Sequence, residues 1–371
     1  MNFAVNLLWV RHNKVGGTES YVRNLLYGFT LLDIDYKIYL IVSEDNKDSF
    51  EEYFADKRFI KVACNVKSAN VAKRILWENL HFGNILKKHH IHICFEPVYS
   101  KPILCSKKIK FITTIHDLQA WHYPEYQSKL RVYWTRYSWR NSVKSSVKII
   151  AISDFVRNDI IERYHCPEKV VTINNPIVID TNDVVSFDEI KKLYHVNEKE
   201  FYYTVSSLLP HKNLITLIHV MKAIHDNKIN LPDKLLISGV GGKDKDLLTR
   251  LIEENGLTGK VVLTGFVENK VRNTLYRYSK AFLFPSIFEG FGMPPVEAMI
   301  FGGSVITTKK TSLYEVTQGK AIYVDDPYNV NEWVERLLEA NKDRQDIDLM
   351  RYDAKAIAEK VYQLIQSLKE D

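Results

Sequence analysis

The sequence predicts an α/β protein built from two doubly wound, Rossmann-like domains. Its 371 residues are enough for two ordinary α/β domains. Short apolar runs alternate with segments of helical periodicity along almost the whole chain, and a polar stretch interrupts this alternation near the middle. Parallel strands need a crossover connection, usually a helix, so the alternation predicts parallel sheets with helices on both faces.

The first half contains six apolar runs that we interpret as strands. A glycine pair, Gly16 and Gly17, follows the first run, and after it apolar residues recur at helical spacing. We assign residues 1–180 to an N-terminal, acceptor-binding domain. Its predicted strands cover residues 2–10, 37–43, 91–97, 110–117, 148–154 and 170–176.

The second half repeats the architecture but not the sequence. The polar stretch 176–199 is interpreted as the domain linker, and residues 181–350 as a nucleotide-sugar-binding domain. Residues 351–371 are predicted to form a helix that packs back on the first domain. The predicted strands cover 201–208, 234–241, 260–267, 280–286, 303–309 and 320–326, with helices at 213–227, 244–255, 270–279, 294–302 and 329–343.

Composition sets the broad class of protein. The hydrophobic content of 46% and the net charge of +6 are those of a globular protein that tolerates an anionic partner. The four cysteines form no CxxC pair and have no zinc-ligand spacing, which is typical of free thiols in a reducing compartment. We find no signal peptide and no apolar run near the ~20 residues of a spanning helix, so we expect a cytoplasmic protein that meets a membrane only at its surface.

The stretch 281–299 organises the predicted site. An apolar run ends at Pro285, a glycine-rich loop follows, and Pro294 and Pro295 fit only the first turn of a helix. Glu289 and Glu297 bracket this loop. Helix N-termini attract anions, and carboxylates accept hydrogen bonds from hydroxyl groups, so the stretch suits the phosphates and sugars of a nucleotide.

Several segments in order resemble one family. EGFGMPPVE has the E-x7-E pattern of the retaining glycosyltransferases of family 4, which have the GT-B fold of two Rossmann-like domains facing a cleft. The resemblance covers essentially the whole chain, and it extends to bacterial polysaccharide mannosyltransferases and rhamnosyltransferases. The other segments that carry it are GGTESYVRNLL, TIHDLQAWHYPE, IIAISDFVRNDI, VSSLLPHKNL, VVLTGFV and TSLYEV.

The resemblance implies roles for individual residues. His116 and Glu289 would be catalytic at the donor sugar, and Asp117 would orient His116 or contact the acceptor. Many members have an arginine where this chain has Ser207, which leaves the usual Arg–Lys clamp on the diphosphate incomplete. The implied donor-binding set is Gly16, Gly17, Ser207, Lys212, Phe266, Gly290, Phe291, Gly292, Met293 and Glu297.

The function implied is retaining, metal-independent transfer of a hexose, mannose favoured, to a glycan or undecaprenyl-linked glycan during surface polysaccharide synthesis. GDP-mannose is the favoured donor, and a UDP-sugar or dTDP-rhamnose is a less favoured alternative. No cofactor or metal is expected. Two alternatives stay open: a sugar-nucleotide epimerase of the same fold, and a non-catalytic nucleotide- or glycan-binding module. A dehydrogenase is disfavoured, because no GxGxxG follows the first strand.

Residues 121–148 are both aromatic and basic. One interpretation is a surface that faces the inner leaflet of a membrane or a lipid acceptor, with aromatic side chains at the interface and cations toward anionic phosphates. The other is an ordinary amphipathic helix packed on the sheet with a solvated basic edge. Nothing else in the sequence supports a nucleic-acid partner.

Overall fold

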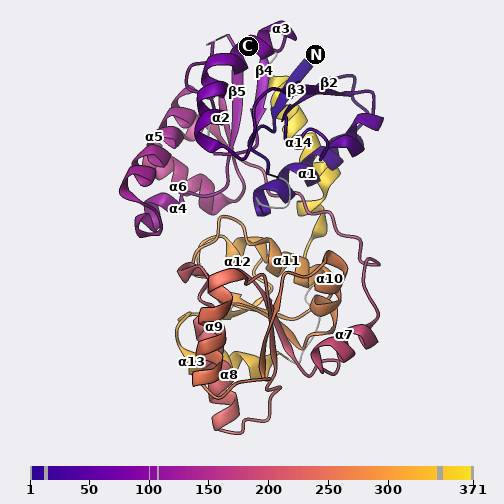
Figure 1. Cartoon of the computed structure of the whole chain (residues 1–371), viewed down its shortest axis with the longest axis vertical. Helices are drawn as coiled ribbons and strands as arrows, with labels where there is room; N and C mark the ends of the chain where they lie inside the picture. Colours follow the sequence, from indigo (N-terminus) through magenta and orange to yellow (C-terminus); the bar gives the residue numbers. More distant parts are fainter. Residues whose placement is uncertain (1, 12–15, 100, 107, 341–345, 369–371) are drawn as a thin grey trace. The chain divides into compact units, whose positions relative to one another are not determined.

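The computed structural model describes residues 2–11, 16–99, 101–106, 108–340 and 346–368. It divides the chain into two compact units. Unit 1 comprises Met1–Val178 and Met350–Asp371, and unit 2 comprises Ile179–Leu349. Each unit is a parallel sheet with helices, which confirms the predicted fold class of two Rossmann-like domains (Figure 1).

The unit 1 sheet has seven parallel strands among the described residues, in the order β3-β2-β1-β4-β5-β6-β7. The order reverses direction at β1 and β4, so the space beyond the carboxyl ends of these two strands is the expected place for a ligand. The strands are β1 (Asn2–Asn6), β2 (Lys37–Ser43), β3 (Phe59–Cys64), β4 (Ile93–Glu96), β5 (Lys110–Ile115), β6 (Lys148–Ala151) and β7 (Val170–Thr172).

The chain returns to unit 1 at its C-terminal end. The last helix lies along the first one, and Gly28 makes this close approach possible, because a Cβ there would lie 2.1 Å from the Ala354 carbonyl oxygen (Figure 1). The unit 1 helices are α1 (Gly17–Thr30), α2 (Val71–Trp77), α3 (Gly83–Lys88), α4 (Gln119–His122), α5 (Lys129–Ser145), α6 (Asp154–Tyr164) and α14 (Ala354–Ser367). A single π-helical turn, Glu78–Phe82, joins α2 to α3.

The unit 2 sheet has six parallel strands among the described residues, in the order β10-β9-β8-β11-β12-β13. They are β8 (Tyr202–Val205), β9 (Leu235–Ser238), β10 (Val261–Gly265), β11 (Ala281–Phe284), β12 (Val305–Thr308) and β13 (Ile322–Val324). The helices are α7 (Phe187–Tyr194), α8 (Leu214–Asp226), α9 (Gly242–Glu254), α10 (Asn269–Tyr278), α11 (Met293–Ile300), α12 (Leu313–Val316) and α13 (Val330–Glu339).

Both faces of the unit 2 sheet are covered. Tyr202 and Leu283 belong to one buried cluster, whereas their chain neighbours Tyr203 and Phe282 belong to another. Successive strand residues point to opposite faces, so two separate clusters mean two covered faces. This explains why the strands read as continuous apolar runs rather than as an alternation.

Two elements were not predicted from the sequence. The first is β3, where Lys61 interrupts a run at the end of the sheet's strand order and one face is partly exposed. The second is α7, which lies in the stretch 176–199 that was expected to hold the linker and the entry to the second domain; its Ile190 is buried in unit 2. The apolar residues of α7 are few but fall on one side, which is enough for a helix packed on a domain surface.

Candidate functional site

His116 and Asp117 directly follow β5 in unit 1. The His116 ring is buried, lies edge-on against Tyr21 at 4.9 Å and packs near Tyr99 at 5.5 Å. Its Nε2 is 2.8 Å from the Pro97 carbonyl oxygen, so this nitrogen carries the proton and donates. Asp117 accepts hydrogen bonds from the Tyr99 hydroxyl at 3.1 Å and from the Gln119 amide at 2.9 Å. The two predicted site residues are thus tied together through Tyr99.

Burial determines the charge of His116. Desolvation lowers its pKa to about 4, and the hydrogen bond to Pro97 opposes this only in part. At neutral pH the ring is therefore an uncharged imidazole with one nitrogen already committed. Its other nitrogen, Nδ1, can therefore only accept a hydrogen bond, for example from a sugar hydroxyl, and the ring brings no positive charge to a phosphate.

The predicted glycine pair lies at the start of α1. Gly16 is the N-cap with φ +67°, a conformation that favours glycine, and Gly17 is the first helical residue. A Cβ at either position would meet nothing within 4 Å inside the described structure. Packing within unit 1 therefore does not require glycine at position 17, which is compatible with a ligand approaching the backbone there.

Lys212 and Glu289 meet in unit 2, although they lie 77 positions apart in the chain. Lys212 ends the turn Pro210–Lys212, and its Nζ donates to Glu289 Oε1 at 2.6 Å. Both side chains are largely buried but still reach solvent, at 20% and 12% exposed. Unit 2 thus pairs the predicted diphosphate cation with the predicted catalytic carboxylate.

The glycine-rich loop is held rigidly from the other side. The Glu289 amide donates to Thr311 Oγ1 at 2.9 Å, and the Ser312 hydroxyl, 2.8 Å from the Phe291 carbonyl, lies within hydrogen-bonding distance of the Glu289 carbonyl as well. Gly292 has φ +91°, and a Cβ there would come within 2.6 Å of Leu313. The TSLYEV segment makes these contacts. They fix the position of the loop backbone, which includes Gly290 and Met293.

The helix after this loop offers few amide donors. Two of the first three residues of α11 are prolines, which carry no N–H. Anion binding through the helix N-terminus, as expected from the sequence, therefore depends on the amides of the loop itself and on Met293.

Glu297 lies in α11 and is buried. Its Oε2 accepts a hydrogen bond from the Tyr276 hydroxyl at 2.9 Å and lies 3.8 Å from Arg272 Nε. Burial and the Glu297 charge raise the pKa of Tyr276, so this phenol stays a donor. The expected role of Glu297 at a ribose stays a prediction.

The remaining predicted donor residues lie beyond the carboxyl ends of β8 to β10. Ser207 is half-buried in the loop between β8 and the Lys212 turn, and the neighbouring Ser206 Oγ is buried with no hydrogen-bond partner among the described residues. Phe266 follows β10, is 83% exposed and lies over Gly241. His211 is buried beside Lys212, and burial and this cation lower its pKa to about 4, so it does not supply the missing positive charge at neutral pH.

The structure therefore brings predicted site residues together in each unit separately. Lys212, Glu289 and the glycine loop meet in unit 2, and His116 and Asp117 meet in unit 1, while the pairing of His116 with Glu289 stays a prediction. Tyr99, Tyr276 and Arg272 were missed; only their tertiary contacts single them out. Within the described residues no group of three or more His, Cys, Asp or Glu side chains is placed to hold a metal ion, and no described helix is long and apolar enough to cross a membrane.

Comparison with protein families assigns both halves of the chain. Residues 15–181 match the model of Glycosyltransferase Family 4, and residues 186–364 match the model of Glycosyl transferases group 1. The chain belongs to the GT-B glycosyltransferases. This membership confirms the resemblance seen in the sequence motifs.

Curated relatives include polysaccharide enzymes. The chain is 30% identical to the Escherichia coli O-antigen chain mannosyltransferase B over 62% of its own length and 61% of that relative, which is less than two thirds of it. It is 29% identical to the Salmonella typhimurium O-antigen chain mannosyltransferase RfbU over 89% of the chain and 88% of the relative.

Solved structures share the fold at low identity. The Anabaena protein HepE, solved with UDP-glucose, superposes with a TM-score of 0.70 at 18% identity, covering 99% of this chain and 100% of HepE. Sucrose-phosphate synthase from Thermosynechococcus elongatus superposes with a TM-score of 0.71 at 14% identity, covering 100% and 99% of the two chains.

Proposed function

We propose that the chain is a retaining, metal-independent hexosyltransferase that moves mannose from GDP-mannose to a glycan or lipid-linked glycan during bacterial surface polysaccharide synthesis. The observation that carries the proposal is the Lys212–Glu289 pair beside the glycine loop. A donor diphosphate entering this place would take over Lys212, and Glu289 would be released to meet the sugar. The Lys212 ammonium suits the diphosphate of such a donor, and the Glu289 carboxylate suits the hydroxyl groups of its sugar.

The leaving diphosphate is the centre of the proposed chemistry. When the bond from the sugar carbon to the phosphate oxygen breaks, negative charge develops on that oxygen, and Lys212 and the loop amides stabilise it. The acceptor hydroxyl attacks the same face of the sugar and its proton passes to the departing phosphate oxygen. No protein nucleophile is needed for this path, and a cation on the protein does the work that a metal does elsewhere.

Mannose as the transferred sugar is supported by the curated relatives, both of which are named mannosyltransferases. A UDP-sugar is the main competitor, because HepE, a protein with the same fold, was solved with UDP-glucose. Phe266 is exposed beyond β10, where it can stack on a base, but stacking tolerates any base and does not choose between them.

We also propose that α5 contacts the inner leaflet of the plasma membrane, with the chain in the cytoplasm. One side of α5 is buried in unit 1 through Val132, Trp139 and Val143, as the ordinary amphipathic interpretation expects. The face that carries Leu130 and Tyr133 is not buried: these side chains are 79% and 71% exposed. Trp134 and Tyr137 continue this face. Exposed cations border it, as a surface for anionic lipid headgroups requires; they are Lys129, Arg131, Arg140 and Lys144.

A thermal-shift panel of GDP-mannose, UDP-glucose, UDP-galactose and dTDP-rhamnose tests the donor. A ligand present at 100 times its Kd stabilises the protein by about 2.7 kcal/mol, which is a shift of several degrees. We expect GDP-mannose to give the largest shift, with and without a chelator. A larger shift with a UDP-sugar would identify that sugar nucleotide, not GDP-mannose, as the donor. The absence of a shift with every ligand would contradict the proposal.

The epimerase and the non-catalytic module are separated by product analysis. Donor is incubated alone and then with membranes that carry lipid-linked glycan, and the sugar products are resolved. Transfer that requires the acceptor supports the proposal. An epimer formed from donor alone, or donor binding without turnover, would favour one of the alternatives.

A further inference from the structure

A polar pocket lies in unit 1, beyond the carboxyl ends of β1 and β4. Its volume is about 430 Å³, within the range of pockets that hold small ligands. We call it the Glu96 pocket. Its charged and aromatic lining combines two carboxyl groups, Glu78 and Glu96, with three guanidinium groups, Arg11, Arg74 and Arg131, and the rings of Trp9 and Tyr99.

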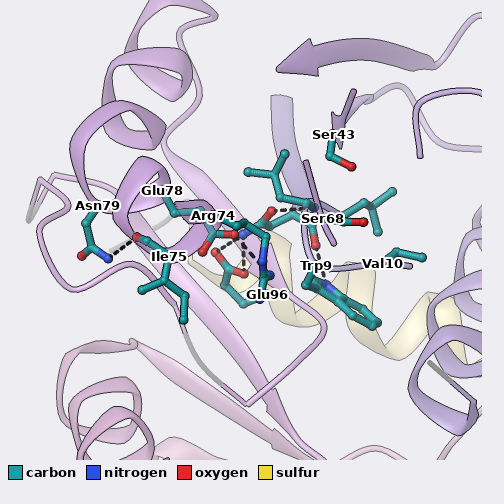
Figure 2. A network of polar contacts seen from close by, with 12 residues as sticks. Trp9, Val10, Ser43, Ser68, Arg74, Ile75, Glu78, Asn79 and Glu96 are labelled. Atoms are coloured by element: carbon teal, nitrogen blue, oxygen red, sulfur yellow. Dashed lines mark hydrogen bonds and ion pairs between the residues drawn. The ribbon is translucent and has the colours of Figure 1, made fainter. Parts of the chain in front are cut away.

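The floor of the Glu96 pocket is a fixed carboxyl group. Glu96 ends β4 and is fully buried, and both of its oxygens accept from Asn6 Nδ2, at 3.2 and 3.0 Å. Asn6 is itself oriented, because its Oδ1 accepts from the Leu8 amide at 3.1 Å. Figure 2 shows Glu96 with Arg74 and Glu78 gathered beside it.

The wall of the pocket carries a charge pair. Arg74 Nη1 lies 3.6 Å from Glu78 Oε1, one helical turn along the chain, and Arg74 Nε is buried with no hydrogen-bond partner among the described residues. Glu78 opens the π-helical turn, a kind of irregularity found often at functional sites. Trp9 Nε1 donates to the Asn6 carbonyl oxygen at 2.9 Å, so Trp9 offers its ring rather than its N–H to the pocket.

Two carboxyl groups this close are unfavourable for folding alone. Burial raises the pKa of Glu96 well above its usual range, and the negative charge of Glu78 raises it further. Burial raises the pKa of Glu78 too, against the pull of Arg74. Buried ionisable groups rarely stabilise a fold as well as apolar ones do, so this cluster points to binding.

We propose that the Glu96 pocket holds a neutral sugar residue of the acceptor, with Glu96, Glu78 and Arg74 on its hydroxyl groups and the Trp9 ring against its carbon face. Hydroxyl groups both donate and accept, as this mixture of carboxyl and guanidinium groups requires. The inference rests on the proposed function, because it names the acceptor of that transfer.

Ligand-observed saturation-transfer NMR tests the pocket without donor. The probes are methyl α-D-mannopyranoside and the methyl glycosides of galactose, glucose and N-acetylglucosamine. We expect at least one to bind the wild-type protein, and Glu96→Gln and Glu78→Gln each to weaken this binding about tenfold, because the amide cannot reproduce the hydrogen bonds of the carboxyl group. Glu162→Gln, an exposed carboxylate of α6, is the matched control and should bind as wild type does.

A purely structural role for Glu96 predicts a different result. If Glu96 acts only in folding, Glu96→Gln at pH 7.5 changes the Tm, and the folded variant binds the glycoside as wild type does. If Glu96 acts in binding, the Tm is kept or raised while glycoside binding falls. If Glu96→Gln does not fold, Glu78→Gln decides alone. No glycoside binding to wild type, or binding that both variants retain, would overturn the inference.

The same samples separate this inference from the proposed function. Nucleotide-sugar thermal shifts depend on unit 2 and should be equal in wild type and in both variants. A wild-type protein that a nucleotide sugar stabilises but no glycoside binds contradicts the pocket alone. A protein that binds a glycoside through Glu96 but responds to no nucleotide sugar contradicts the proposed transfer instead.

Discussion

Single residues set the chemistry of the predicted donor site. Lys212 Nζ donates to Glu289 Oε1, so each of these side chains limits the freedom of the other. Under the proposed function, a donor diphosphate takes over Lys212 and leaves Glu289 to the sugar. Substituting one of them should therefore affect transfer and nucleotide binding differently.

Glu289→Ala should remove transfer while largely sparing nucleotide binding. The carboxylate is proposed to act at the sugar, whereas Lys212 then remains free for the diphosphate. We expect transfer to fall at least about 100-fold, the size of effect seen for one electrostatic group in an active site. The measurement is acceptor-dependent transfer beside a nucleotide thermal shift, with exposed Glu335→Ala of unit 2 as control. A fully active variant would sink the assignment.

His116 should make the stability of unit 1 depend on pH. Its folded pKa of about 4 lies below the ordinary value of 6.5, so the unfolded chain binds the extra proton first as pH falls. The contribution of neutral His116 to the free energy of unfolding is complete above pH 6.5 and decreases between pH 6.5 and 4. Below pH 4 the free energy of unfolding is lower by roughly 3 kcal/mol. Chemical unfolding of wild type and His116→Gln across this range checks it. Parallel curves for the two proteins would contradict the prediction.

At the scale of elements, one glycine conformation shapes the donor loop. Gly292 has φ +91° and no room for a Cβ beside Leu313. Gly292→Ala should therefore cost about 1–3 kcal/mol of stability and displace the loop. Thermal unfolding and nucleotide binding are measured together. Gly17→Ala, where a Cβ meets nothing within 4 Å, is the stability control, and an equal loss in both variants would refute the explanation.

The exposed face of α5 is the element that decides membrane contact. Leu130→Ser with Tyr133→Ser should reduce co-sedimentation with vesicles that contain anionic phospholipid by about tenfold, because apolar area is lost from the interface. Binding to the wild type should weaken with salt and be low on zwitterionic vesicles. Tyr328→Ser, an equally exposed tyrosine of unit 2, is the control. Vesicle binding that the double variant retains would contradict the proposal.

At the scale of the whole molecule, the chain crosses between its two units twice. It leaves unit 1 after Val178 and returns at Met350, and α14 then buries Ile357, Val361 and Ile365 within unit 1. The return is fastened by hydrogen bonds as well: the Ile177 amide donates to the Tyr352 carbonyl at 2.9 Å. Unit 1 is therefore incomplete until the last residues are made.

Gly28→Ala should destabilise unit 1 selectively. The new methyl group would collide with the Ala354 carbonyl and push α14 from α1, at a cost of about 1–3 kcal/mol. We expect the melting of unit 1 to move to lower temperature, while nucleotide-sugar binding by unit 2 is preserved. Calorimetry with and without the donor distinguishes the two transitions. Loss of nucleotide binding with an unchanged unfolding curve would contradict the assignment of Gly28 to the stability of unit 1 and of nucleotide binding to unit 2.

Much of the fold was predictable because local patterns carry it. The strands of unit 2 fell within their predicted ranges, since strands covered on both faces read as apolar runs that glycine and proline interrupt. β3 and α7 were not predicted from the sequence. Each is covered on one side only, and the polar side chains on its other side weaken the apolar pattern. Most predicted strands are longer than the observed ones, because the residues that follow each strand continue its sequence pattern.

The sequence by itself determined the two-unit parallel architecture and, through its ordered motifs, the family. Only the tertiary structure decided that Glu289 pairs with Lys212, that Tyr276 holds Glu297, and that Asn6, Glu78 and Glu96 share one pocket. The physical reason is that periodicity records which side of an element is buried, whereas these contacts join side chains from separate strands and helices. The burial that lowers the pKa of His116 and raises that of Glu96 is likewise a property of the packed unit, not of the local sequence.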